Sequence, residues 1–358
     1  MKAAVATGET DQLSTVVDNY PIPEINDDQI LLKAHSFAIN PIDYKHIEFG
    51  IAQKGDILGD DVSGIVEKVG SNVKGFKKGD FISSFVSGDV AKTNGAFAEY
   101  VAVEPQATVK YEQLIDEVDI KSGLIKTFDG AASVTLGLVT VGISFAYSLE
   151  IPENKQDGDF ILIWGGSTAT GILAIQLAKL IYGLNVITTA SPKNFDYLKS
   201  LGADYVFNYN DSDIVSKIKD LTKGKLRFSL DVVGTADTLQ KIYDATADVK
   251  GDVYIDNVLL AQQDDINLDN NRNNSNLHWG TTLSFLVIDE VKNLGAAIPR
   301  PEDLFKYYNP WWFDVLPKYI AQLKNGNLKI LKDGLASADE GLKLIHKGVS
   351  NEKIVFNV

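Results

Sequence analysis

The sequence predicts an α/β fold in which a doubly wound parallel sheet is inserted into a β-rich domain. Residues 1–138 carry short apolar strand patterns separated by glycine turns, which are typical of a partly open antiparallel barrel. Between residues 139 and 295, long helical patterns alternate with apolar strands, as in a parallel sheet covered by helices. Residues 296–358 return to a different pattern of aromatic helix and final strand. A chain of 358 residues is also too long for a single core.

Residues 160–171 carry a strand, glycine turn and helix start that are typical of dinucleotide binding. An apolar strand at 160–164 leads into glycines at 165, 166 and 171. Such a turn presents backbone N–H groups to a diphosphate, and glycine allows close approach. The predicted cofactor-binding residues are Gly165, Gly166, Ser167, Thr168, Ala169, Thr170 and Gly171. Thr168 stands where the middle glycine of G-x-G-x-x-G is expected, so the alternative is a structural turn of any doubly wound sheet.

The end of the second predicted strand, residues 185–190, indicates which dinucleotide is bound. An Asp or Glu at this point would hold a free ribose 2′-hydroxyl. This strand is instead followed by Ser191 and Lys193. A hydroxyl and a cation suit a 2′-phosphate, so the sequence predicts NADPH as the cofactor. The alternative is a solvated lysine in the first turn of the next helix.

The composition excludes several classes of protein. With 34 Lys and Arg against 48 Asp and Glu, the net charge is −14, which repels nucleic acid and anionic lipid. The absence of cysteine excludes disulfides, thiol catalysis and cysteine-based zinc sites. No apolar run approaches the roughly 20 residues of a membrane helix. We expect a cytoplasmic protein without nucleic-acid or membrane partners.

Several motifs occur in the order found in one known family. They are residues 40–45 (NPIDYK), 59–64 (GDDVSG), 95–100 (GAFAEY), Ala131 and Ala132 followed by Thr140, the 165–171 turn, and 202–204 (GAD) leading to 208–209 (NY). In these motifs the chain resembles the zinc-independent medium-chain dehydrogenases/reductases of the quinone oxidoreductase and enoyl reductase branch, especially fungal members.

The resemblance implies a GroES-like substrate domain from residues 1–138 and 296–358, with a Rossmann NADPH-binding domain from 139–295 between them. It implies a reductase of small electron-poor carbonyl compounds: an enone or enal, a quinone or an aldehyde. Alcohol/aldehyde interconversion, enoyl-thioester reduction and a low-turnover regulatory NADPH-binding protein remain alternatives. Relatives are often dimers, so a homodimer is a reasonable expectation.

The family pattern also bears on metal and substrate. Zinc-dependent relatives place Cys and His ligands at the positions of Asn40 and residues 59–61, where this chain has neither. No metal is therefore expected, and hydrogen-bond donors or water must polarise a carbonyl. Enoyl-thioester reductases of the branch carry a tyrosine just beyond a glycine as proton donor. Here Gly50 is followed by Ile51, which counts against that activity.

The resemblance implies four catalytic candidates. Thr140 matches a residue beside the nicotinamide, and Asn40, Tyr44 and Lys45 belong to the loop that faces the reacting ring. Asn40 would donate to an oxygen that gains charge. Lys45 would stabilise an enolate or bind cofactor phosphate or ribose, and Tyr44 would line the pocket. The alternatives are a helix-interior threonine, a turn-forming asparagine, a core tyrosine and a surface lysine.

Two further residues complete the predicted cofactor site. Tyr209 matches a family residue near the adenosine 2′-phosphate, and its alternative is a strand-end aromatic. Gly234 follows the fourth strand of the parallel sheet and would let backbone approach the nicotinamide ribose. The adjacent carboxylates Asp60 and Asp61 face opposite sides of a strand, so one is expected to hold loop structure rather than act in catalysis. His46 is expected to be structural.

Overall fold

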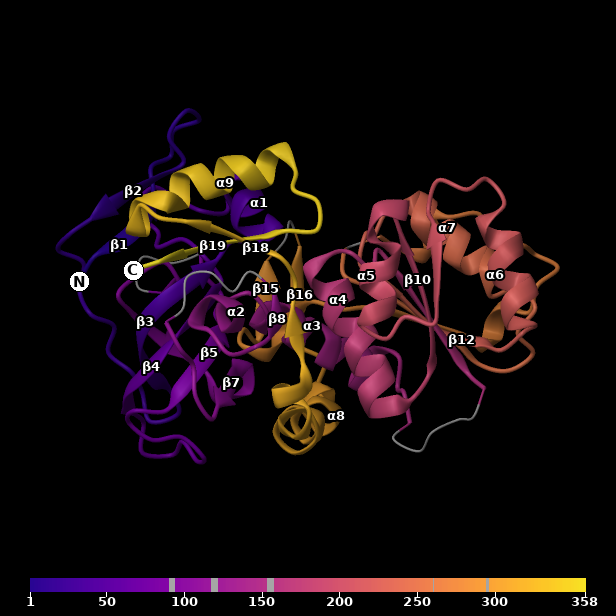
Figure 1. The fold of residues 1–358 in the computed structure, drawn as a ribbon, viewed down its shortest axis with the longest axis horizontal. Coiled ribbons are helices and arrows are strands. Elements are labelled where there is room, and N and C mark those ends of the chain that lie inside the picture. Colours follow the sequence, from indigo (N-terminus) through magenta and orange to yellow (C-terminus); the bar gives the residue numbers. More distant parts are fainter. Residues whose placement is uncertain (90–93, 117–121, 153–157, 260, 294–295) are drawn as a thin grey trace. The chain divides into compact units, whose positions relative to one another are not determined.

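The computed structural model describes residues 1–358 except 90–93, 117–121, 153–157, 260 and 294–295. The chain separates into two compact units (Figure 1). The first comprises Met1–Val139, Phe285–Pro301 and Leu316–Val358, and the second comprises Thr140–Ser284 and Glu302–Val315. This division differs from the predicted boundaries in three places. Val139 and residues 285–295 belong to the first unit, and 302–315 to the second.

The first unit is built on a sheet that, in the described residues, has seven strands in the order β18-β19-β3-β4-β5-β7, with β6 also pairing with β3. Their bounds are β3 (Ile30–Ala38), β4 (Asp61–Val69), β5 (Phe81–Phe85), β6 (Tyr100–Val103), β7 (Thr108–Tyr111), β18 (Leu328–Leu331) and β19 (Lys353–Asn357). The C-terminal strand β19 lies between β18, to which it is parallel, and β3, to which it is antiparallel (Figure 1). Both ends of the chain therefore build one domain, as predicted.

The core of the first unit joins residues that are distant in the sequence. The rings of Phe37, Phe97 and Phe356 lie with centroids 4.9–5.8 Å apart and are fully buried. Aromatic rings at such spacings stabilise a core beyond the area that they bury. Helix α9 (Ser337–Lys347) packs on β19 and contacts α1 (Pro41–Glu48).

Smaller elements complete this unit. They are β1 (Ala3–Ala6) paired with β2 (Ser14–Val17), β8 (Gly123–Leu124) paired with β17 (Lys324–Asn325), α2 (Phe128–Ala132), and β15 (Val291–Asn293) paired with β16 (Ala297–Pro299). The sequence also predicts a strand at residues 95–101, but regular pairing begins only at Tyr100. Before it, Gly95 lies so close to the carbonyl of Ile57 that a Cβ would stand 2.3 Å from that oxygen, and no side chain fits there.

The second unit contains a six-stranded parallel sheet, among its described residues, in the order β11-β10-β9-β12-β13-β14. The strands are β9 (Phe160–Trp164), β10 (Asn185–Ala190), β11 (Tyr205–Asn208), β12 (Leu226–Asp231), β13 (Val253–Asn257) and β14 (Leu277–Thr281). The first strand, β9, is central, and successive strands are added on one side and then on the other. This reversal confirms the doubly wound fold, and it marks the carboxyl end of β9 as the place where such sheets bind ligands.

Successive strands from β9 to β13 are connected by α4 (Ala169–Leu177), α5 (Phe195–Ser200), α6 (Ile214–Thr222) and α7 (Ala236–Ala245) (Figure 1). Helix α3 (Thr135–Ile143), which begins in the first unit, precedes β9 in the chain, and α8 (Leu304–Pro310) follows β14. Aromatic residues of the last helical segment are core residues of this unit. The Nε1–H of Trp311 donates to Tyr182 Oη over 3.0 Å, and Trp311 is 4 % exposed.

The sequence predicts the sixth strand of this sheet at residues 282–288 and a mobile surface insertion at 262–276, and the structure differs from both predictions. The strand lies at Leu277–Thr281 rather than at 282–288, where a short 3₁₀ turn forms instead. The Asn-rich segment 262–276 is attached to α7 rather than free on the surface. The guanidinium of Arg272 stacks over the Tyr243 ring at 4.4 Å and donates to the carbonyl oxygens of Tyr243 and Thr246. A single cation–aromatic contact with two hydrogen bonds explains why the segment is held.

One helical run, Phe128–Ser148, is long and apolar enough by length and composition to cross a membrane. The expectation that no apolar run approaches this length is therefore wrong. In the folded chain 83 % of its most apolar window is buried. A helix that is apolar on all sides must be covered by protein or by lipid, and here the protein itself covers most of the window.

Candidate functional site

The turn between β9 and α4 excludes side chains at two of its glycines. A Cβ on Gly166 would lie 2.0 Å from Thr188 Oγ1, and one on Gly171 would lie 2.4 Å from the carbonyl oxygen of Gly165. Gly165 itself has φ +95°, which favours glycine. Glycine is therefore required for the close packing and the backbone conformation of this turn, where the sequence predicts that a diphosphate binds.

Thr168 explains the departure from the usual glycine pattern. It is the N-cap of α4, and its Oγ1 accepts the Gly171 N–H over 3.0 Å and donates to the Gly165 carbonyl over 2.9 Å. The next two N–H groups, of Ala169 and Thr170, have no acceptor within the helix because they belong to its first turn. These donors and the positive end of the helix dipole fit a dinucleotide diphosphate.

The register of β10 and β11 brings together two of the residues that are predicted to bind the 2′-phosphate. Ala190 at the end of β10 pairs with Asn208 at the end of β11, so the next residues, Ser191 and Tyr209, lie side by side. Their hydroxyl oxygens are 3.4 Å apart. Lys193 follows in an exposed 3₁₀ turn and forms no ion pair with a described residue. The Ser191 and Tyr209 hydroxyls thus lie at the carboxyl edge of the sheet, with Lys193 two residues further along the chain, and binding of a 2′-phosphate by these residues stays a prediction.

Gly234 lies in a tight turn after β12. It has φ +66°, and a Cβ there would stand 2.7 Å from Leu259 Cβ. The Asp231 carboxylate accepts the N–H groups of Val233 and Gly234, each over 2.9 Å. The turn requires glycine for these reasons, and contact of Gly234 with a nicotinamide ribose stays a prediction.

The four predicted catalytic residues divide between the two units. Thr140 lies in α3, is 4 % exposed and belongs to the second unit, whereas Asn40, Tyr44 and Lys45 belong to the first. Tyr44 packs against the first unit's core, with its ring 4.3 Å from that of His346. Lys45 is half-buried on α1 and forms no ion pair with a described residue.

Asn40 is held by a network that the sequence did not reveal. It is the N-cap of α1 and is 4 % exposed. Its Nδ2 donates to Asp61 Oδ2 over 2.9 Å, and its Oδ1 accepts a hydrogen bond from Lys353 Nζ. Lys353 Nζ also lies 3.6 Å from Asp61 Oδ2, and Asp61 Oδ1 accepts the Leu136 N–H over 2.8 Å. Burial raises the pKa of Asp61, and the Lys353 charge opposes that rise.

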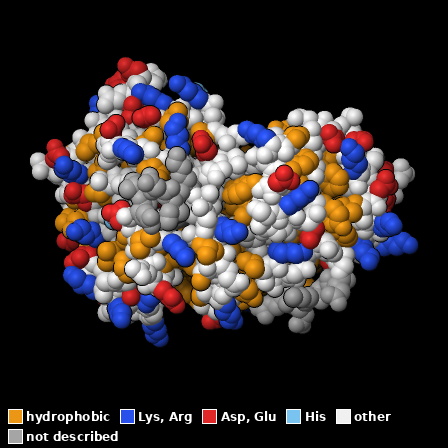
Figure 2. All heavy atoms as spheres, viewed as in Figure 1, with side chains coloured by type: hydrophobic (Ala, Val, Ile, Leu, Met, Phe, Trp, Pro, Cys, Tyr) orange, Lys and Arg blue, Asp and Glu red, His pale blue; other side chains and the backbone are white. Residues whose placement is uncertain are grey.

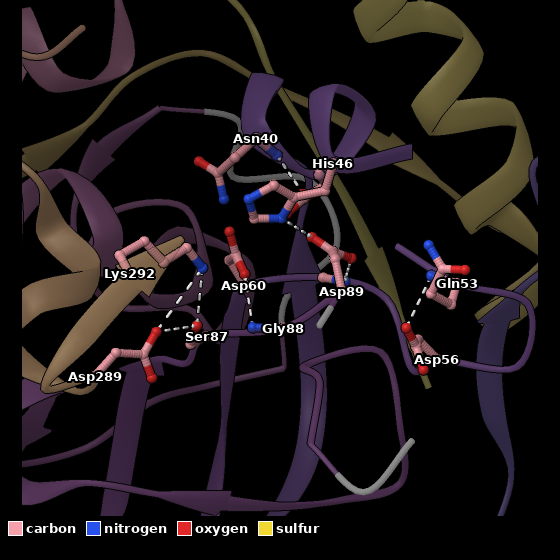
Figure 3. Close-up of polar contacts among 12 residues, drawn as sticks. Asn40, His46, Gln53, Asp56, Asp60, Ser87, Gly88, Asp89, Asp289 and Lys292 are labelled. Atoms are coloured by element: carbon pink, nitrogen blue, oxygen red, sulfur yellow. Dashed lines mark hydrogen bonds and ion pairs between the residues drawn. The ribbon is translucent and has the colours of Figure 1, made fainter. Parts of the chain in front are cut away.

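Asp43 of α1 forms a cluster of three carboxyl groups with Asp60 and Asp89, each with 0 % exposure. Figure 3 shows Asp60 and Asp89 of this cluster. One oxygen of each accepts a backbone N–H at 2.7–2.9 Å, from Asn40, Gly88 and Gly59 respectively. Asp60 and Asp61 thus contact separate partners, as expected for neighbours on opposite sides of a strand. The cluster fixes the loops around residues 59 and 88.

Burial dominates the charge state of the cluster. It raises the pKa of Asp60 and of Asp89 to about 8, with the Asp89 charge adding to the rise at Asp60, and it raises the pKa of Asp43 well above its usual range. His46 Nδ1 lies 3.1 Å from Asp89 Oδ2, and burial lowers the pKa of this imidazole. These facts fit a structural role for His46.

Lys292 borders the same cluster (Figure 3). Its Nζ lies 3.7 Å from the centre of the Phe285 ring, donates to Ser87 Oγ over 3.2 Å and is 3.8 Å from Asp289 Oδ2. Burial lowers the pKa of this ammonium. Within the described parts of the chain, Asp43, Asp60 and Asp89 form the one group spaced to hold a metal ion. Their raised pKa values favour protons at neutral pH, and metal ligands must be deprotonated.

Comparison with known proteins identifies the family of this chain. Residues 26–113 match the family model "Alcohol dehydrogenase GroES-like domain", and residues 169–270 match "Zinc-binding dehydrogenase". Trans-enoyl reductase ACTTS2 of Alternaria alternata is 32 % identical over 352 residues, which cover 96 % of this chain and 95 % of that protein. The chain belongs to the medium-chain dehydrogenase/reductase family. It is an oxidoreductase of the quinone and enoyl reductase-like branch.

Other relatives agree with this family assignment. Trans-enoyl reductase TOXD of Cochliobolus carbonum is 37 % identical over 79 % of this chain and 89 % of its own length. An uncharacterized protein of Saccharomyces cerevisiae is 32 % identical over 99 % of this chain and 97 % of its own. Among solved structures, the quinone oxidoreductase of Coxiella burnetii superposes over 100 % of both chains with TM-score 0.68 and 24 % identity. It supports the fold of this medium-chain dehydrogenase/reductase.

Sequence reasoning on this dehydrogenase/reductase missed Lys353, Asp89 and Lys292. Each lies far from the motif that it contacts, so no local spacing signals it. Lys353 reaches Asn40 because β19 pairs with β3, the strand that ends two residues before Asn40, and this pairing is seen only in the folded chain. Asp89 has φ +64°, which marks a non-glycine residue held by its surroundings, and this angle too is seen only in the structure.

Figure 2 shows acidic and basic side chains intermixed over the visible face, with hydrophobic side chains scattered between them. On this face the net charge of −14 is not gathered into one acidic patch. Surface charge therefore identifies no binding face in this view. The candidate site comprises the glycine turn, the residues predicted to bind a 2′-phosphate (Ser191, Lys193 and Tyr209), and the Asn40 network.

Proposed function

We propose that this protein is a metal-independent, NADPH-dependent reductase that passes hydride to a small electron-poor carbonyl compound. The acceptor classes are an enone or enal, a quinone and an aldehyde. The observation that carries the proposal is the gathering of Ser191, Tyr209 and Lys193 at the strand ends, since these donors complement a 2′-phosphate. The family assignment supplies the reaction type, an NAD(P)-dependent reduction.

The chain's own residues orient the cofactor and stabilise charge. A bound nicotinamide supplies the hydride. The N–H groups of Ala169 and Thr170 in the first turn of α4 would hold the diphosphate, and the lack of side chains at Gly165 and Gly166 would leave the turn in the shape that binding requires. When a conjugated acceptor is reduced its oxygen gains negative charge, and we assign the Asn40 N–H and the Lys45 ammonium as donors to that oxygen.

Metal independence is supported by the donor set. Asn40 stands where zinc-dependent relatives place a ligand, and both ends of its amide are engaged by Asp61 and Lys353. The buried carboxyl groups of Asp60 and Asp89 have pKa values of about 8 and are protonated at neutral pH. Carbonyl polarisation is therefore assigned to N–H donors.

A second candidate, the reduction of an enoyl thioester, is favoured by the relatives named trans-enoyl reductases. The residue after Gly50 weighs against it, because Ile51 cannot donate the proton that a tyrosine supplies in thioester reductases of this branch. An enone or enal and an enoyl thioester are each reduced at a C=C bond conjugated to a carbonyl, and they differ in the group attached to that carbonyl.

The deciding experiment follows oxidation of NADPH and of NADH against enones, enals, quinones, aldehydes and enoyl thioesters, with and without EDTA. We expect NADPH to be preferred, EDTA to have no effect, and enones or enals to give saturated carbonyl products. Alcohol products would favour alcohol/aldehyde interconversion. A preference for NADH or loss of turnover in EDTA would refute the proposal, and tight NADPH binding without oxidation would indicate a regulatory protein.

Replacing Lys193 by alanine is expected to raise the KM for NADPH about tenfold or more and to leave the KM for NADH unchanged. One charge-assisted hydrogen bond is worth about 1.5–3 kcal/mol, and only NADPH carries the 2′-phosphate. Lys199→Ala, on the exposed surface of α5, is the matched control and should change neither value. Equal loss of both cofactors would show that Lys193 does not read the 2′-phosphate.

A further inference from the structure

Three neighbouring strands bring Lys353, Asn40 and Asp61 to one face of the sheet. In the pairing of β19 with β3, Val355 stands opposite Ala38, and in the pairing of β3 with β4, Ala38 stands opposite Asp61. The Ile39 N–H donates to the Ile354 carbonyl over 2.9 Å, so the pairing continues beyond the strand end. Because side chains alternate between faces, Lys353 and Asn40 face each other on the side where Asp61 lies.

The two partners of Asn40 are chemically opposite. The Lys353 ammonium can only donate, and it contacts the amide oxygen. The Asp61 carboxylate can only accept, and it takes an N–H from Nδ2 over 2.9 Å. A rotated amide would set two donors against each other at Lys353 and two acceptors against each other at Asp61. All three residues are less than 9 % exposed, so water cannot replace these bonds without a cost in free energy.

The Asn40 amide can donate a second hydrogen bond. An asparagine amide has two N–H bonds, and Asp61 uses one of them. Because Lys353 contacts Oδ1 and Asp61 contacts Nδ2, the amide has one orientation. The second hydrogen of Nδ2 can then be donated, and this end of the amide cannot accept a hydrogen bond. The oxygen that gains charge during reduction requires a donor.

We propose that Lys353 is a positioning residue that fixes the Asn40 amide so that it offers an N–H to the reacting oxygen. The inference rests on the donor role given to Asn40 in the proposed function. Lys353 acts through Asn40 and not by contact with substrate. In this way a residue of β19 orients the N-cap residue of α1.

The test compares Lys353→Met with the double variant Lys353→Met/Asp61→Asn. The single variant leaves a buried carboxylate without its cation, which destabilises folds strongly. The double variant removes both charges, so the fold is retained, but residue 61 then either donates or accepts and no longer selects one amide orientation. Lys329→Met is the matched control, because Lys329 lies on β18 beside the same strand.

Three properties are measured: amide exchange, the hydride step and NADPH binding. In selectively ¹⁵N-asparagine-labelled protein, assigned with Asn40→Ser, hydrogen exchange of the Asn40 side-chain amide reports its fixation without cofactor or acceptor. Steady-state reduction of trans-2-hexenal and of phenanthrenequinone with NADPH, together with the isotope effect from deuterated NADPH, reports the hydride step. NADPH binding is followed by fluorescence.

We expect exchange of the Asn40 amide to be at least about tenfold faster in the double variant and kcat to fall about tenfold to a hundredfold, since a misplaced group costs up to about 10²-fold. The NADPH dissociation constant should stay within about twofold, and Lys329→Met should match the wild type. Unchanged exchange would overturn the inference. Unchanged kcat would show that Lys353 merely neutralises Asp61, and a tenfold weaker NADPH affinity would make it a cofactor ligand instead.

The outcomes for the two proposals are separable. If Asn40→Ser retains wild-type kcat, the donor role in the proposed function fails, while amide exchange still decides whether Lys353 fixes the side chain. If neither acceptor is reduced by the wild type, the proposed acceptor classes fail, and the exchange result stands alone. Loss of kcat in Asn40→Ser together with full activity of the double variant overturns the positioning role only.

Discussion

Replacing Gly166 by alanine weakens NADPH binding by about a hundredfold or more and lowers the free energy of unfolding by about 1–3 kcal/mol, the usual cost of overpacking. The new Cβ would stand 2.0 Å from Thr188 Oγ1 and 3.0 Å from Thr188 Cβ. Thr188 cannot yield easily, since its hydroxyl donates to the Ile163 carbonyl over 2.7 Å in the centre of the sheet. The turn must shift, and the N–H groups that it aims at the diphosphate shift with it. Titration of NADPH fluorescence and chemical denaturation measure the two effects.

A matched control and a rescue identify the cause. A Cβ on Gly251 would have no heavy atom within 4 Å, so Gly251→Ala should change neither NADPH affinity nor stability. Thr188→Ala removes the nearest clashing atom, and in combination with Gly166→Ala it should recover part of the lost affinity. Wild-type affinity in Gly166→Ala alone would contradict the placement of the diphosphate at this turn.

Replacing Asp60 by asparagine removes a pH dependence of stability. The folded-state pKa of Asp60 is raised to about 8 by burial, above its ordinary value of 3.8. The folded protein therefore holds a proton that the unfolded chain has lost between these values, and the free energy of unfolding falls as pH rises through this window. Between pH 6.5 and 8 the variant should gain about 1–2 kcal/mol relative to the wild type, since one proton over one pH unit is worth about 1.4 kcal/mol.

The comparison with the wild type isolates Asp60 from its neighbours. Burial lowers the pKa of His46 and of Lys292, and each contributes the opposite slope, but both are present in the two proteins. Urea denaturation at pH 5, 6.5, 8 and 9 gives the difference directly. Asp18→Asn, at an exposed carboxyl with 73 % side-chain exposure, is the control, and its difference from the wild type in free energy of unfolding should not vary with pH. A flat difference for Asp60→Asn would mean that the buried carboxyl is ionised throughout.

The local elements of the nucleotide-binding unit are predictable because they depend on short-range chemistry. The turn at residues 165–171 needs glycine at fixed spacing, and its position after β9 is visible in the apolar run that precedes it. Ser191 and Tyr209 can be placed together because parallel register follows from the order of strand ends. The N-cap role of Thr168 is not evident from the glycine spacing, in which this threonine stands only as a missing glycine.

Elements whose bounds depend on packing are less predictable. The sequence places the sixth strand at 282–288, whereas β14 is Leu277–Thr281, because the Asn-rich stretch before it lacks the apolar pattern that marks a buried strand. The attachment of that stretch to α7 depends on Arg272 meeting the Tyr243 ring. No pattern within the stretch predicts a contact with a helix residue 29 positions earlier.

The fold class, the glycine turn and the identity of the residues at the strand ends follow from the amino-acid order, because each is set by neighbours in the chain. That Asn40 is held between Asp61 and Lys353, and that Asp43, Asp60 and Asp89 share one buried site, depends on the folded arrangement. Hydrogen bonding and desolvation act through space. Their effect on orientation and pKa is defined only when strands from both ends of the chain are brought together.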